Sequence, residues 1–246
     1  MAQIIDLSVV TITYNERENI VLFIEEVNRV FSAMNIVGEI VVVDDSSPDG
    51  TAEVVRGLRQ KYLHTHLIVR AGKLGIASAY KTGVDAAVGR VVALLDADLS
   101  HPPEALAEMY RLALEDRVVF GSRYLGDTLF ETDVAHKIGT KLLNVWIRCW
   151  LDTGIKDHTL GYLVVRRENL QNIITYGGER GFVPFARVLY GLSIAGIGKK
   201  LGLMMQEVRA PYAKRVHGDT KIPFLKGLRI VLSDMIYTVK IWWSLK

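Results

Sequence analysis

Apolar runs alternate with amphipathic segments through the first half of this chain. The apolar runs are rich in Val, Ile and Leu, which is typical of strands buried on both faces of a parallel sheet. They cover residues 7–13, 39–44, 67–70, 91–96 and 118–121. Segments with helical spacing of apolar residues lie between them, at 19–34, 51–62, 76–88 and 103–114. The alternation predicts an α/β fold with a doubly wound, mostly parallel sheet flanked by helices.

The second half follows a different pattern. It predicts helices over 134–151, over 178–195 with an interruption at Pro184, and over 224–245, with a short strand over 161–166. No repeat or low-complexity linker separates the two halves. We therefore expect one domain over 1–222, elaborated from about residue 124, followed by an amphipathic helix over 223–246.

The last helix has apolar residues at helical spacing, interrupted by charged residues. The apolar positions are Leu228, Val231, Leu232, Met235, Val239 and Trp242. This pattern is too charged to span a bilayer and is typical of a helix that lies in a membrane interface. The pair Trp242 and Trp243 suits the headgroup level. The alternative is a helix packed on the sheet, with both tryptophans in the core.

Charge is unevenly distributed along the 246 residues, whose net charge is +3. Between residues 209 and 246, eight lysines and arginines outnumber two aspartates, so this segment carries +6. Basic segments bind phosphate or anionic surfaces, although many merely face solvent. Because aromatic and aliphatic residues are interleaved with this charge, we expect a membrane surface as the partner and no nucleic acid.

Cysteine usage and hydropathy bear on the compartment. Cys149 is the single cysteine, which excludes an internal disulfide framework and suits a reducing compartment. The start of the chain lacks the basic-then-apolar pattern of a signal peptide. No stretch of about 18 uncharged apolar residues occurs, so no membrane-spanning helix is predicted. We expect a protein of the cytoplasm that associates peripherally with a membrane.

Two carboxylates follow the apolar run at 91–96. Asp96 and Asp98 stand one residue apart, ahead of Pro102 and Pro103. Such groups repel each other unless a cation lies between them, and Mg²⁺ or Mn²⁺ takes oxygen ligands and bridges phosphates. The sequence predicts a metal site here, and the alternative is an Asp turn before a helix that begins at proline.

Polar residues also follow the other strands of the first half. They are Thr13-Tyr14-Asn15-Glu16, Asp44-Asp45-Ser46 and Arg70-Ala71-Gly72-Lys73. Right-handed crossovers bring the carboxyl ends of parallel strands to one edge of the sheet, so these residues and Asp96-Ala97-Asp98 should form one site.

Two of these strand ends suit a nucleotide. An acidic residue after the second strand suits ribose hydroxyls, although the whole cluster could be a simple turn. Backbone N–H groups at the start of a helix, together with Lys73, can hold phosphate oxygens. A dinucleotide-binding oxidoreductase is excluded, because the first strand lacks a following G-x-G-x-x-G. A Walker sequence is absent as well.

The order and content of these motifs resemble the inverting nucleotide-sugar glycosyltransferases of family two, and within them the dolichyl- or polyprenyl-phosphate mannosyltransferases. The matching segments are TYNERENI (13–20), VVVDDSSPDGT (41–51), RAGKLGIASAYKTG (70–83), LLDADLSHPPE (94–104), FGSRY (120–124) and RVHGDTK (215–221). The segment DHTLGY (157–162) is similar to the family pattern D-x-T-S-G-[FY], with Leu160 in place of Ser.

The resemblance implies a GT-A fold and assigns roles to particular residues. Donor-binding residues would be Tyr14, Glu16, Asp44, Asp45, Lys73, Asp96, Ala97 and Asp98. Asp96 and Asp98 would hold Mg²⁺ or Mn²⁺ on the diphosphate, with Ser100 where relatives carry Gln or Ser. Asp98, Arg123, Arg215 and Lys221 would serve catalysis: Arg123 near the sugar or acceptor phosphate, and the last two from a loop that closes over the diphosphate.

The activity implied is transfer of mannose, with inversion, from GDP-mannose to a dolichyl or polyprenyl phosphate at the cytoplasmic face of a membrane. A phosphate acceptor is already anionic at neutral pH, so it needs no general base, unlike a hydroxyl. One alternative is hexosyl transfer from a UDP-sugar to lipid phosphate or to a saccharide hydroxyl. Another is a non-catalytic nucleotide-sugar binder.

Overall fold

The computed structural model describes residues 4–126, 134–181, 184–186, 190–211 and 224–246. Its centre is a seven-stranded sheet of order β3-β2-β1-β4-β6-β5-β7, in which β6 alone is antiparallel to its neighbours. The strands are β1 (Leu7–Thr13), β2 (Gly38–Asp44), β3 (Thr65–Val69), β4 (Val91–Leu94), β5 (Arg117–Ser122), β6 (Leu163–Arg166) and β7 (Met204–Arg209).

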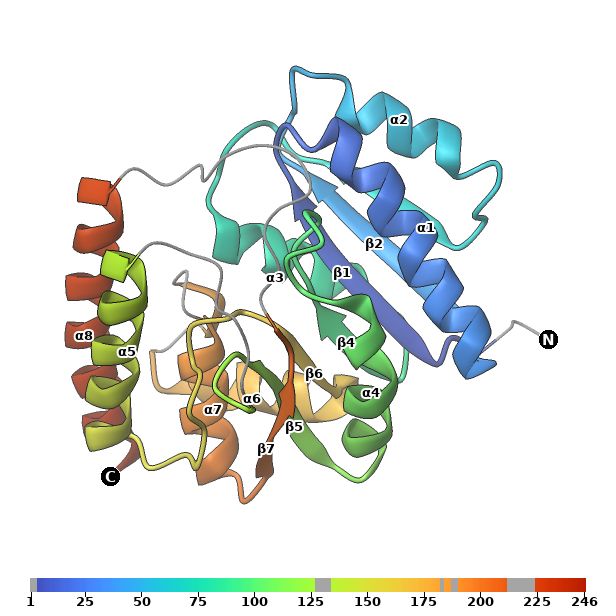
Figure 1. The fold of residues 1–246 in the computed structure, drawn as a ribbon. Helices are drawn as coiled ribbons and strands as arrows, with labels where there is room; N and C mark the ends of the chain where they lie inside the picture. Colours follow the sequence, from blue (N-terminus) through green and yellow to red (C-terminus); the bar gives the residue numbers. More distant parts are fainter. Residues whose placement is uncertain (1–3, 127–133, 182–183, 187–189, 212–223) are drawn as a thin grey trace.

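Helices cover both faces of the sheet, as Figure 1 shows. They are α1 (Arg17–Met34), α2 (Thr51–Leu58), α3 (Ile76–Ala86), α4 (Leu106–Leu114), α5 (Val134–Trp150), α6 (Arg167–Glu179), α7 (Tyr190–Lys200) and α8 (Phe224–Leu245), with short 3₁₀ turns at Pro103–Ala105 and Pro184–Ala186. The apolar core on one face is formed with α1, α2 and α4, and that on the other face with α3, α6 and α7.

The central strands are apolar throughout because both of their faces are covered. Successive side chains of a strand point to opposite faces. Val9 accordingly lies in the core beneath α1 and α4, while its neighbour Val10 lies in the core beneath α3. The continuous apolar runs in the sequence therefore correspond to parallel strands, as predicted.

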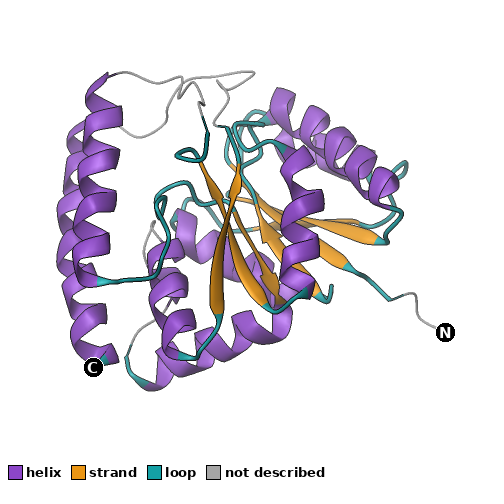
Figure 2. Cartoon of the chain, turned by 60° about the horizontal axis from the view of Figure 1, so that its bottom comes forward, coloured by secondary structure: helices purple, strands orange, loops and turns teal. Residues whose placement is uncertain are grey.

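Helices α5 and α8 stand beside each other at one side of the molecule (Figures 1 and 2). A small separate core joins them to α7, formed by Leu143, Ile147, Leu151, Leu192, Tyr237 and Ile241. The two tryptophans of α8 lie in different environments. Trp242 packs edge-on against Trp150, with ring centroids 5.2 Å apart, whereas Trp243 is 74% exposed. Within the described part of the chain, every helix is too short or too polar to cross a bilayer.

Most predicted elements are present, with three differences in the second half. The predicted helix over 178–195 is wrong: α6 ends at Glu179, and α7 begins only at Tyr190. The predicted range overlaps α6 by two residues only, and α6 itself was not predicted. Helix α6 ends just before Gly181, whose φ angle is +73°, and Pro184 begins a separate 3₁₀ turn. Strand β7 was not predicted, since an edge strand of mixed exposure shows little apolar periodicity.

Candidate functional site

The carboxyl ends of β1, β2, β3 and β4 meet at one edge of the sheet, because the four strands are parallel neighbours. This confirms the predicted convergence of the polar segments after each strand. Exposure divides the predicted residues into two groups. Tyr14, Glu16, Lys73 and Asp96 reach solvent. Asp44, Asp45, Ala97, Asp98, Ser100 and Arg123 are buried.

Asp44 organises the loops after β1 and β2. Its side chain is fully buried, and its Oδ1 accepts hydrogen bonds from the hydroxyls of Thr13 at 2.8 Å and Ser47 at 2.5 Å. Its Oδ2 accepts the backbone N–H of Ser47 at 2.8 Å. Ser47 in turn accepts the backbone N–H of Asn15 through its hydroxyl. In this structure Asp44 therefore joins two strand ends, and its contact with a nucleoside stays a prediction.

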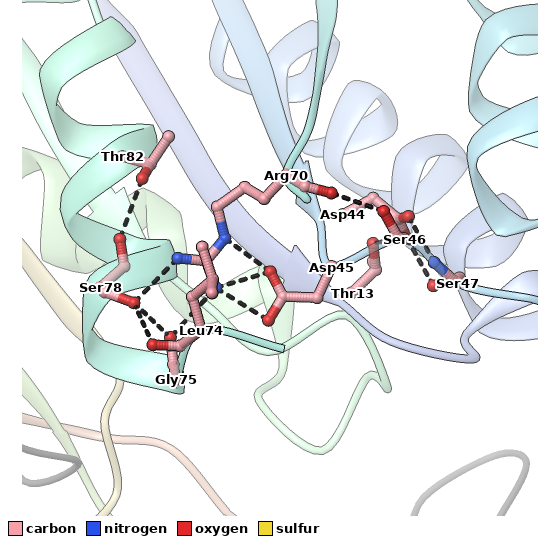
Figure 3. Close-up of polar contacts among 10 residues, drawn as sticks. All are labelled: Thr13, Asp44, Asp45, Ser46, Ser47, Arg70, Leu74, Gly75, Ser78 and Thr82. Atoms are coloured by element: carbon pink, nitrogen blue, oxygen red, sulfur yellow. Dashed lines mark hydrogen bonds and ion pairs between the residues drawn. The ribbon is translucent and has the colours of Figure 1, made fainter. Parts of the chain in front are cut away.

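Asp45 is neutralised by an arginine from the neighbouring strand end (Figure 3). The Nε and Nη2 of Arg70 donate to the two carboxylate oxygens of Asp45, at 2.6 and 2.8 Å. The same guanidinium donates to Ser78 Oγ at 2.8 Å and to the carbonyl of Gly75 at 3.1 Å. Arg70 thus fixes the loop between β3 and α3 against the end of β2, and Lys73 is the exposed cation of that loop.

Lys73 lies against the first strand end. Its Nζ is 3.5 Å from the ring centroid of Tyr14, which is a cation–π contact. The side chain is exposed, so the ammonium can still meet a phosphate. The structure therefore brings together two predicted donor-binding residues that lie 59 positions apart in the sequence. Glu16, two residues after Tyr14, accepts a hydrogen bond from the side-chain amide of Asn19 at 2.6 Å.

The backbone at this edge is strained. Asn15, Ser46 and Leu99 have positive φ angles of 56°, 53° and 60°, although none is glycine. They lie in the loops that follow β1, β2 and β4 respectively. Left-handed backbone is costly for such residues and persists where the surroundings demand one geometry, as at binding sites.

Asp96 and Asp98 differ in exposure but share the chemistry that a hard cation requires. The Asp96 side chain is 41% exposed, whereas Asp98 is buried. Asp98 Oδ1 accepts the N–H and hydroxyl of Ser100 at 3.0 and 2.5 Å, so Ser100 supports Asp98 in this structure. Its contact with a metal stays a prediction.

The described residues contain no group of three or more His, Cys, Asp or Glu side chains suited to a metal. Two carboxylates nevertheless fit Mg²⁺ or Mn²⁺, because such ions are commonly held by one or two carboxylates together with substrate phosphates. An exposed carboxylate beside a buried one also leaves room for those phosphates. The residues present therefore fit a divalent cation whose remaining ligands come from the donor and water.

Tyr80 of α3 supports Asp96 from within the core. Its hydroxyl donates to Asp96 Oδ1 at 2.8 Å. Burial, the charge of Asp96 and the neighbouring Tyr190 raise the pKa of Tyr80 well above its ordinary value, so the hydroxyl keeps its proton. Sequence reasoning missed Tyr80, since a tyrosine on the apolar face of a helix resembles an ordinary core residue.

His101 is a buried structural residue. Its Nδ1 accepts the backbone N–H of Asp96 at 3.2 Å, and its ring stacks on Tyr162 with centroids 5.3 Å apart. In the sequence it stands directly before Pro102 and Pro103. The structure adds that this imidazole holds the backbone on which the two candidate metal ligands lie.

Arg123, at the end of β5, forms a buried ion pair with Asp157. Its Nε and Nη2 donate to the two Asp157 oxygens at 2.7 and 2.8 Å, and its backbone N–H donates to Oδ2 at 3.1 Å. Burial alone would raise the pKa of Asp157, but hydrogen bonds and the charge of Arg123 hold it below the ordinary value. No role was predicted for Asp157 from the sequence. Its position as the first residue of DHTLGY, the segment similar to the family pattern D-x-T-S-G-[FY], could have indicated one.

Arg123 also donates to the Thr159 hydroxyl at 2.5 Å. The segment 157–162 therefore anchors this arginine at the same edge of the sheet, separated from β4 by β6. The other two predicted cations, Arg215 and Lys221, lie outside the described residues.

Two proteins of known identity are similar to this chain in sequence. A dolichol-phosphate mannosyltransferase of Pyrococcus furiosus is 31% identical over 227 residues, which are 91% of this chain and 57% of that protein. A polyprenol monophosphomannose synthase of Mycolicibacterium smegmatis is 35% identical over 167 residues, 65% of this chain and 62% of that protein. The chain thus spans about three fifths of the length of these relatives.

Solved structures with the same architecture include the mannosyltransferase PcManGT from Pyrobaculum calidifontis in complex with GDP-Man and Mn²⁺. Its TM-score is 0.62 at 19% identity, over 99% of this chain and 74% of that one. A glucosyl-3-phosphoglycerate synthase from Mycobacterium tuberculosis, in complex with Mn²⁺, UDP and glucosyl-3-phosphoglycerate, has a TM-score of 0.61 at 20% identity, over 96% and 79% of the two chains. These likenesses confirm the predicted GT-A fold.

The profile of the family "Glycosyl transferase family 2" matches residues 8–174, which include every described strand end discussed above. With this match and the extended identity to the Pyrococcus furiosus protein, the chain belongs to glycosyl transferase family 2.

Proposed function

We propose that this protein transfers mannose from GDP-mannose to a polyprenyl or dolichyl phosphate, with inversion at the sugar. The observation that carries the proposal is the order of groups along one sheet edge. Solvent-accessible Tyr14 and Lys73 follow β1 and β3, Asp96 and buried Asp98 follow β4, and Arg123 follows β5, which lies two positions beyond β4. Strands lie about 4.8 Å apart, so roughly 10 Å separates the two positions, which suits a hexose between two phosphate groups.

The relatives support both substrates. The names of the two relatives described above specify dolichol phosphate and polyprenol monophosphate mannosyl chemistry. A solved relative of the same fold holds GDP-Man and Mn²⁺. We infer the same donor and a divalent cation for this chain, with Mn²⁺ or Mg²⁺ as the physiological ion.

We propose the following roles for residues of this chain. Tyr14 and Glu16 would contact the nucleoside, and Lys73 would meet the diphosphate. A divalent cation held by Asp96 and Asp98 would neutralise the charge that develops on the departing diphosphate. Arg123, fixed by Asp157, would orient the acceptor phosphate, which attacks without first losing a proton.

The decisive experiment offers the protein polyprenyl phosphate with a panel of nucleotide sugars, including GDP-mannose and UDP-glucose, and identifies the lipid product by mass spectrometry. A mannosyl lipid phosphate formed only with a divalent cation, and lost in Asp98→Ala, is the expected result. Asp85→Ala is the matched control, since Asp85 is an exposed carboxylate of α3 paired with Lys81. A glucosyl product would refute the donor, and no product from any sugar would refute the activity.

We further propose that α5 and α8 lie against the membrane that carries the acceptor. Both helices expose apolar side chains at helical spacing. They are Ile138, Leu142 and Val145 of α5 and Leu232, Ile236 and Trp243 of α8, each 49–74% exposed. Exposed apolar rows on paired helices fit a membrane interface, and the net charge of +6 over residues 209–246, which include α8, favours anionic lipid.

Flotation with anionic liposomes tests this surface. Leu142→Glu and Ile236→Glu should each reduce the lipid-bound fraction, because a charged side chain opposes burial in the interface. Leu63→Glu is the matched control, since Leu63 is 77% exposed in the loop after α2. Equal flotation of all variants would mean that the acceptor is reached by another surface.

A further inference from the structure

The Asp96 carboxylate is held by an uncharged hydrogen-bond donor, so its negative charge is not neutralised by that partner. The fully buried Tyr80 donates its hydroxyl to Asp96 Oδ1 at 2.8 Å, while the Asp96 side chain remains 41% exposed. Two other carboxylates of this sheet edge have a cationic partner instead: Arg70 neutralises Asp45, and Arg123 neutralises Asp157. A neutral hydroxyl restrains a carboxylate but does not cancel the negative charge that a cation requires.

Tyr80 is itself restrained by a second tyrosine. Its ring packs against that of Tyr190 of α7, with centroids 5.1 Å apart and planes at 56°. The Tyr190 hydroxyl donates to the carbonyl of Gly161 at 2.5 Å. Gly161 has a φ angle of +80° and follows the segment 157–159 that binds Arg123. Two buried tyrosines thus connect Asp96 to the loop that anchors Arg123.

We propose that Tyr80 is a positioning residue that fixes the Asp96 carboxylate for a divalent cation, and that Tyr190 keeps Tyr80 in place. This inference rests on the proposed function, in which Asp96 is a metal ligand. A half-exposed aspartate can rotate about its side-chain torsions, and a hydrogen bond to one oxygen selects the rotamer before the cation arrives. Removal of a partner that orients a metal ligand in this way commonly lowers the affinity for the metal 10–100-fold.

The experiment measures Mn²⁺ binding by electron paramagnetic resonance, with and without GDP, for the wild-type chain and tyrosine variants. Tyr80→Phe should bind Mn²⁺ about 10-fold more weakly, because it removes one hydroxyl and keeps the ring. Tyr190→Phe should weaken binding in the same direction by a smaller factor. Tyr110→Phe is the matched control, since Tyr110 is half-buried on α4 and packs against the core of the opposite sheet face.

Asp96→Asn separates failure of the inference from failure of the proposed function. Wild-type Mn²⁺ affinity in Tyr80→Phe, with weak binding in Asp96→Asn, would overturn the inference alone. Wild-type affinity in both would overturn the metal site itself. Circular dichroism of the metal-free variants checks their folding, and if Tyr80→Phe does not fold, unchanged Mn²⁺ affinity in Tyr190→Phe overturns the inference. Saturating Mn²⁺ should restore most of the turnover of Tyr80→Phe, which it would not do for a merely misfolded variant.

Discussion

Replacement of Asp157 by alanine should destabilise the protein strongly, because it leaves the Arg123 guanidinium buried without its counterion. The Arg123 side chain is 6% exposed and that of Asp157 is fully buried. Asp157 also accepts hydrogen bonds from the N–H and hydroxyl of Thr159. The substitution therefore removes an ion pair and several hydrogen bonds at once.

The expected magnitude follows from the burial of both partners. Removal of one member of a buried ion pair costs about 3–5 kcal/mol of the free energy of unfolding. For a chain of this size each kcal/mol lowers the melting temperature by about 2–4 °C, so the loss should be roughly 6–20 °C. Replacement of both partners should cost less than the sum of the single changes, because no lone charge then remains.

Urea unfolding at pH 7, followed by circular dichroism, should be measured for Asp157→Ala, Arg123→Met and the double variant. The cycle should give a coupling energy of about 1–3 kcal/mol. Single losses that add to within about 0.5 kcal/mol would refute the reasoning, as would a loss below about 1 kcal/mol for Asp157→Ala. Because the pKa of Asp157 is lowered by folding, its contribution is complete above its ordinary pKa of 3.8 and declines as the pH falls through the folded value.

Two other predictions concern stability. Burial lowers the pKa of His158 to about 4, so the unfolded chain binds more protons than the folded chain between pH 6.5 and 4. As the pH falls across that window, the free energy of unfolding should decrease by about 3 kcal/mol. Chemical unfolding of His158→Gln should lack this decrease, and an identical decrease in the variant would contradict the assignment. Gly83→Ala should cost about 1–3 kcal/mol in the same assay, because its Cβ would collide with Val10 beneath α3. The control Gly57→Ala, with open space around it in helix α2, should instead stabilise by roughly 0.5–1 kcal/mol, and equal effects of the two changes would count against the packing argument.

Sequence patterns were sufficient wherever the structure depends on local periodicity. The apolar run that became β4 is continuous because both faces of that strand are buried, and helix α8 has the bounds that its amphipathic pattern predicted. Parallel connection then required the polar ends of β1 to β4 to share one edge. The location of the candidate site therefore followed from the sequence, as did the carboxylates Asp96 and Asp98.

Strand neighbours in the second half could not be derived in this way. Strand β6 enters the sheet antiparallel between β4 and β5, although it follows both in the chain. Strand β7 forms the edge beside β5 with few buried side chains, so its pairing is determined by backbone hydrogen bonds that leave little trace in the sequence. The break between α6 and α7 likewise depends on how each helix packs on the sheet.

The sequence by itself determined the α/β fold class, the sheet edge that carries the candidate site and the residue types available there. Only the tertiary structure decided which of those residues face solvent and which hold one another. Arg70 precedes the phosphate-binding candidate Lys73 in the sequence, and the family resemblance placed Arg123 near the sugar or acceptor phosphate. Each nevertheless forms an ion pair with an aspartate 25 or 34 residues away. Tyr80 likewise meets Asp96 only because α3 packs on β1 and β2, and β4 lies next to β1 in the sheet. Such pairings depend on which strands and helices become neighbours, and local patterns of hydrophobic and polar residues do not encode that choice.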